Sequence, residues 1–180
     1  HWDFDAQVCA AIEKDPNAFD LARYFDTAAV KGFLTGADSS LRAQTEKLMD
    51  TLGVREKECF GISLSAVQDK IAHVVANAAL GQCMAVVLKE RYPNCTIVFG
   101  GIQASPDSIH EQYYRQFMEE CPQIDYARIG WGDETAVQLF RNIWRGAHEA
   151  NSALSNVLYR KRGIPGPAGI RMGRPPGSGM

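Results

Sequence analysis

The chain has 180 residues, 46% of them hydrophobic and 22% charged, which is enough to bury the core of one domain. Its 19 basic and 21 acidic side chains give a formal net charge of -2, which argues against nucleic acid as a main ligand. No apolar run approaches the about 20 residues of a membrane-spanning helix, and the N-terminus shows no signal-peptide pattern, so we expect a cytoplasmic protein with no membrane partner.

Residues 1–56 are predicted to form a helical N-terminal region. Apolar residues recur there at helical spacings in three segments. Asp15-Pro16-Asn17 and Gly36-Ala37-Asp38-Ser39 separate the segments, and Ser or Asp can cap the helix that follows. The helically spaced residues are Phe4, Val8 and Ile12, then Leu21, Phe25, Val30 and Phe33, then Leu41, Leu48 and Leu52.

Residues 57–147 change to short apolar runs that alternate with amphipathic helices. The runs at 59–64, 96–99 and 125–129 are predicted strands. Helices are predicted from Val67 to Tyr92, from Ser105 onward and from Asp133 onward. This β-α-β-α-β-α order predicts an α/β domain, a Rossmann-like (flavodoxin-like) open parallel sheet with flanking helices.

Residues 148–180 are predicted to be a linker and a flexible tail. Asn156 to Tyr159 could add one more edge strand. From Gly163 onward the sequence is rich in Pro, Gly and Arg, a composition that is not expected to bury a core.

Ligands of open parallel sheets bind at the carboxyl ends of the strands. Three such ends can be identified, and glycines at two of them would let a ligand approach the backbone. Each following helix offers unpaired N–H groups and a positive dipole end. The predicted ends are Gly61 to Ser65, Gly100 to Ser105 and Gly130 to Glu134. A sizeable, partly anionic cofactor lying across this edge would fit.

The three segments, taken in order, carry a family resemblance. GIS, a long helix, IVFGGIQAS and IDYARIGWGDETAVQLF resemble the second half of the cobalamin-binding domain of cobalamin-dependent radical S-adenosylmethionine enzymes, including those that modify peptides. The resemblance covers about residues 58 to 146 of the chain. The ordered set is more distinctive than any one of its pieces.

The resemblance implies a cobalamin site. It places Ser63 and Ser65 against the nucleotide tail of the cofactor. Gly100, Gly101, Ile102 and Gln103 would line the slot for the dimethylbenzimidazole or its rim, and Gly130, Trp131, Gly132, Asp133 and Glu134 would close the other side of the tail.

The sequence also departs from the family. Gln103 and Trp131 stand where the family often has His and Glu. The D-x-H-x-x-G loop that supplies a cobalt ligand in other cobalamin proteins does not occur, so no metal-ligating residue is predicted. The family's first βα unit does not precede this region, so the pocket would be incomplete.

The five cysteines bear on catalysis. Cys9, Cys59, Cys83, Cys95 and Cys121 are widely spaced, and we expect free, mostly buried thiols. Radical S-adenosylmethionine chemistry needs three closely spaced thiolates for an iron-sulfur cluster. We therefore expect no catalytic residue in this chain, with the cluster and S-adenosylmethionine held by a catalytic domain in cis or trans.

Two other functions stay open. The run from Gly130 to Thr135 approaches the G-x-G-x-x-G fingerprint but has Thr at the third glycine, so the chain could be a nucleotide-binding enzyme domain. It could also be a non-catalytic partner-binding or regulatory domain that binds no corrinoid.

Overall fold

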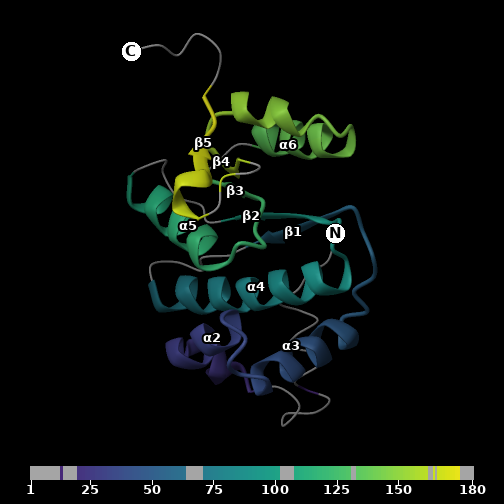
Figure 1. The fold of residues 1–180 in the computed structure, drawn as a ribbon, viewed down its shortest axis with the longest axis vertical. Helices are drawn as coiled ribbons and strands as arrows, with labels where there is room; N and C mark the ends of the chain where they lie inside the picture. Colours follow the sequence, from purple (N-terminus) through teal and green to yellow (C-terminus); the bar gives the residue numbers. More distant parts are fainter. Residues whose placement is uncertain are drawn as a thin grey trace.

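The computed structural model describes residues 13, 20–63, 71–101, 108–130, 133–161, 164 and 166–174. It confirms the predicted α/β class: a Rossmann-like open sheet flanked by helices (Figure 1). The elements in chain order are η1 (Leu21–Phe25), α2 (Thr27–Leu34), α3 (Ser40–Thr51), β1 (Cys59–Ser63), α4 (Ile71–Arg91), β2 (Thr96–Gly100), α5 (Ser108–Glu120), β3 (Tyr126–Arg128), α6 (Asp133–Trp144), η2 (His148–Ala153), β4 (Val157–Arg160), η3 (Pro167–Gly169) and β5 (Ile170–Met172).

The sheet has the strand order β1-β2-β3-β4-β5. The first three strands are parallel, as predicted, whereas β4 and β5 are antiparallel to their neighbours. The sheet is therefore mixed. The strand predicted from Asn156 to Tyr159 is present as β4, but it is not an edge strand, because β5 pairs along its outer side.

The prediction of a flexible tail was also wrong for its last described part. Ile170 in β5 is only 1% exposed and belongs to the main core. A Cβ atom on Gly173 would lie 2.1 Å from the carbonyl oxygen of Leu154. The high glycine content predicted an unpacked tail, but these glycines allow the backbone around β5 to pack closely. The composition therefore gave no indication of a strand of only three residues.

The helices cover both faces of the sheet. Side chains alternate between the faces along a strand. In β2, Ile97 and Phe99 join the large cluster with α4 and α5, while Val98 joins Leu139 and Ile143 of α6 on the other face. Figure 1 shows α6 on one side of the sheet and α4 on the other, with α2 and α3 as a further layer beyond α4.

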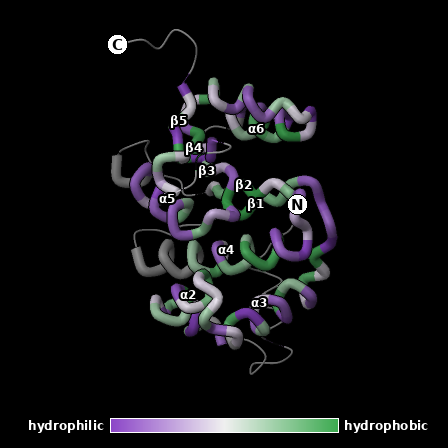
Figure 2. Tube along the Cα trace, viewed as in Figure 1, coloured by the Kyte–Doolittle hydropathy of each residue, from purple (hydrophilic) through white to green (hydrophobic). Residues whose placement is uncertain are grey.

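Helix α4 is the central helix of the molecule. Its residues from Ala78 to Leu88 are buried except for the partly buried Leu80. A helix that is apolar on all sides must be covered on all sides. Here the sheet covers one side of it and α2, α3 and η1 cover the other. Figure 2 shows the hydrophobic residues in the middle of α4 in green.

The N-terminal helices α2 and α3 form where the apolar spacing predicted them. In η1, however, Phe25 is 57% exposed and Tyr24 is buried in its place. Asp26 caps α2 by accepting from the N–H groups of Ala28 and Ala29. The first predicted segment lies outside the described residues. No described helix is both long and apolar enough to cross a membrane.

Candidate functional site

The carboxyl ends of the parallel strands form one edge, as the sequence predicted. Ser63 at the end of β1 lies opposite Gly100 at the end of β2. Val98 and Phe99 pair with Tyr126 and Ala127, so the same register places Arg128, the last residue of β3, beside Gly100. A row of Ser63, Gly100 and Arg128 therefore crosses three strands.

Arg128 is the unusual member of this row. Its Nε and Nη2 atoms are buried and have no hydrogen-bond partner among the described residues. Side chains alternate along β3, so Arg128 lies on the same face as Tyr126, which packs with α6. A buried guanidinium donor without an acceptor is destabilising, and an anionic group would relieve that cost.

Glycine at position 100 keeps the row open. Within the described part of the chain, a Cβ atom built on Gly100 would meet the Cβ and the carbonyl oxygen of Arg128, both at 3.9 Å. The next residue, Gly101, is exposed and has φ +93°, a conformation that side-chain-bearing residues avoid. The chain can therefore turn sharply beside Arg128 and leave its backbone accessible to a ligand.

The third strand end leads into α6. Gly130 is buried and has φ 76°, so it makes the turn that follows β3. Helix α6 begins at Asp133, and its first N–H groups have no partner within the helix. The exposed Glu134 follows in the first turn. The helix dipole adds a positive end close in sequence to Arg128.

The structure brings together part of the predicted site. Ser63, Gly100 and Gly101 lie at one edge, and Gly130 and Glu134 lie at the turn into α6. Five predicted residues lie outside the described part of the chain, and so does the side chain of Asp133. The five are Ser65, Ile102, Gln103, Trp131 and Gly132.

Arg128 was not among the residues predicted from the sequence. It belongs to the run DYARI, which was identified only as a strand. A charged residue among apolar ones at the end of a parallel strand was the available signal, because charged side chains are seldom buried without a partner.

The four described cysteines are free, with Cys83, Cys95 and Cys121 buried and Cys59 partly buried. Burial raises the pKa of Cys59, Cys83 and Cys121 to about 12. These thiols are therefore protonated at neutral pH and are poor nucleophiles. Within the described residues, no group of three or more His, Cys, Asp or Glu side chains could hold a metal ion.

Comparison with known proteins does not assign the chain to a family. No family model matches the chain, and no curated protein matches it significantly.

Proposed function

We propose that this chain is the cobalamin-binding module of a radical S-adenosylmethionine enzyme, which transfers methyl groups or carries out a related radical modification of a substrate such as a peptide. The iron-sulfur cluster and S-adenosylmethionine would belong to a separate catalytic domain, in cis or in trans. The proposal rests first on the sequence resemblance between residues 58 and 146.

One observation supports an anionic cofactor at the carboxyl edge of the sheet: the buried, unpartnered donors of Arg128. The nucleotide tail of cobalamin contains one phosphodiester group, and an arginine fork matches phosphate geometry. The residues present therefore fit the charged part of that cofactor. When bound, the corrin would supply the methyl-carrying chemistry.

The chain's own residues would hold and orient the cofactor. Arg128 would donate to the phosphodiester, and Ser63 would lie one strand further along the same edge. The sharp turn at Gly101 would leave room beside the end of β2. The buried free thiols favour a reducing compartment, so we propose a cytoplasmic location.

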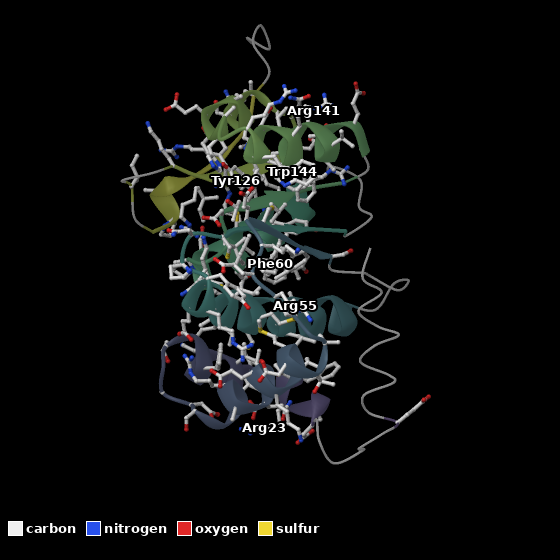
Figure 3. All side chains as sticks on the ribbon, turned by 90° about the vertical axis from the view of Figure 1, so that its right-hand side faces the viewer. Arg23, Arg55, Phe60, Tyr126, Arg141 and Trp144 are labelled. Carbon is white, nitrogen blue, oxygen red and sulfur yellow. The ribbon has the colours of Figure 1, made fainter. Side chains whose placement is uncertain are left out.

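Titration of the purified chain with hydroxocobalamin, followed by visible absorbance and calorimetry, tests the proposal. Saturable binding is expected. Arg128→Met should weaken it by at least about tenfold, because a hydrogen bond to a charged group contributes roughly 1.5–3 kcal/mol. Arg141→Met is the matched control, since Arg141 is exposed on α6 (Figure 3) and should leave the affinity unchanged.

The outcomes separate the alternatives. Arg128-dependent binding of a mononucleotide or dinucleotide, without binding of hydroxocobalamin, would replace the corrinoid with a nucleotide. No binding of either at millimolar ligand would overturn the cofactor proposal and leave a domain that binds a protein partner.

A further inference from the structure

A pocket of about 600 Å³ lies at the amino edge of the parallel strands, opposite to the candidate cobalamin site. Its wall includes Thr96 at the start of β2 and Tyr126 at the start of β3. Because β4 runs antiparallel to β3, its last residue, Arg160, reaches the same edge. The volume falls in the range of small-molecule sites, about 300–1,000 Å³.

The charged groups of this pocket are unbalanced. Among the described residues that line it, three cations, Lys89, Arg160 and Lys161, face one carboxylate, that of Asp125. Asp125 is already engaged, because its Oδ2 lies 2.9 Å from Lys89 Nζ and accepts a hydrogen bond of 2.8 Å from the N–H of Ile97. Arg160 and Lys161 are left as two positive charges.

Arg160 is held in place but not saturated. Its Nη2 donates to the carbonyl oxygen of Met118, which fixes the guanidinium plane. Its Nε is buried and has no partner among the described residues. Burial lowers the pKa of Arg160. The negative charge of the neighbouring Asp125 acts in the opposite direction, but its effect is smaller. An anion in the pocket would balance the positive charge of this guanidinium.

Another part of the pocket wall is formed by the aromatic side chains of Tyr126 and His148. The Tyr126 hydroxyl lies 3.1 Å from His148 Nδ1, and the two rings are stacked with an angle of 11° between their planes. In Figure 3, Tyr126 lies at the sheet, on the α6 side of Phe60. The pocket thus offers a cationic end and a flat wall that an organic group could contact.

We propose that this amino-edge pocket, formed by Lys89, Asp125, Tyr126, His148, Arg160 and Lys161, binds a small phosphate monoester. At neutral pH such a phosphate carries a charge of about -1.5 to -2, which matches the two uncompensated cations. An arginine fork beside a lysine is a common phosphate-binding arrangement. The site is independent of the cobalamin proposal, because it lies on the opposite edge of the sheet.

The test is an NMR titration of the full chain, with backbone amide shifts recorded against phenyl phosphate and, separately, against succinate at equal ionic strength. Saturable shifts are expected at Thr96, Tyr126 and Lys161 with phenyl phosphate. The titration is repeated in Arg128→Met, where shifts at Gly101 should disappear if phosphate also occupies the other edge. Shifts at Lys161 should persist in that variant.

Two variants and a control test how much each cation contributes to the affinity for phenyl phosphate. Arg160→Gln should weaken binding by at least about tenfold, as expected for a charged hydrogen bond. Lys161→Gln should weaken it by about threefold, because Lys161 is exposed, and it should fold normally. Lys31→Gln, an exposed lysine on α2, should leave binding unchanged.

Three results would overturn the proposal. The first is the absence of saturable shifts at Thr96, Tyr126 and Lys161. The second is saturable binding of succinate without phenyl phosphate, which would assign a dicarboxylate instead. The third is an equal loss of affinity in Lys31→Gln and Lys161→Gln, which would indicate general attraction to positive charge.

Discussion

Arg128 lies directly beside Gly100 across two parallel strands, since a Cβ atom on Gly100 would contact the Cβ atom of Arg128 at 3.9 Å. This places a cation with two buried donor atoms next to a strand end that carries no side chain. The sequence predicted Gly100 as a site residue, whereas it did not predict Arg128.

Arg128→Met should stabilise the free protein or leave its stability unchanged. Removing buried donors that lack an acceptor recovers about 1–3 kcal/mol of desolvation cost, while Met keeps most of the packing. Urea unfolding monitored by circular dichroism measures the change. A loss of more than about 1 kcal/mol would show that Arg128 is a structural residue, because surface changes elsewhere stay within about 0.5 kcal/mol.

The two glycines after β2 should respond differently to alanine. Gly100→Ala places a methyl group at ordinary contact distance and should be tolerated. Gly101→Ala forces a side-chain-bearing residue to φ +93° and should lower the free energy of unfolding by about 1–2 kcal/mol. Parallel urea titrations of both variants check this, and equal effects would contradict the backbone argument.

The last strand should be essential to stability. Gly173→Ala would place a methyl group 2.1 Å from the carbonyl oxygen of Leu154, where backbone would have to move. We expect a loss of more than about 2 kcal/mol, at the upper end of ordinary single substitutions. Gly146→Ala is a useful comparison, because Gly146 has open space around it and only its φ of +69° is unfavourable. A neutral Gly173→Ala would mean that β5 is not packed in solution.

Tyr24 and Thr45 should be energetically coupled. The Tyr24 hydroxyl lies 2.9 Å from Thr45 Oγ1, and both side chains are buried between η1 and α3. Thr45→Val should destabilise the protein by about 1–2 kcal/mol, because a buried hydroxyl loses its partner. The double variant Tyr24→Phe/Thr45→Val should lose less than the sum of the single variants. Additive losses in a double-mutant cycle would contradict the coupling.

The buried thiols predict a loss of stability at alkaline pH. The pKa values of Cys83 and Cys121 are raised by burial to about 12, from 9.0 for an exposed thiol. Between these values the folded state binds more protons than the unfolded state, so the free energy of unfolding falls as pH rises. The contribution is fully present below pH 9 and is lost as pH rises from 9 towards 12.

Melting temperatures between pH 7 and 11 measure this effect. Cys83→Ala and Cys121→Ala each remove one titrating thiol and should flatten the alkaline decline, although each is less stable at pH 7 because a cavity forms. Thiol-specific labelling at pH 8 should be slow in the folded chain and fast in urea. An unchanged slope in both variants would assign the decline to other groups.

The local pattern was sufficient to predict much of this fold. Alternating apolar runs and helices predicted β1, β2 and β3, because a buried parallel strand needs an uninterrupted apolar segment. The apolar spacing between Val67 and Tyr92 predicted the long helix α4, but as an amphipathic helix, whereas Ala78 to Leu88 are buried almost throughout. The glycines at the ends of the second and third predicted strands lie where the chain adopts positive φ, at Gly101 and Gly130.

Long-range contacts decided the rest. The pairing of β5 with β4 depends on residues that meet only after the sheet has formed, and a three-residue strand carries too little pattern to be found alone. The same holds for the two sites: strand register places Arg128 beside Gly100, and the packing of α4 on the sheet places Lys89 in the pocket that Asp125 and Arg160 also line. The sequence by itself determined the parallel strands and the longer helices, because these depend on apolar periodicity along the chain. Only the tertiary structure decided which charges lie together and lack partners, because that depends on which strands pair.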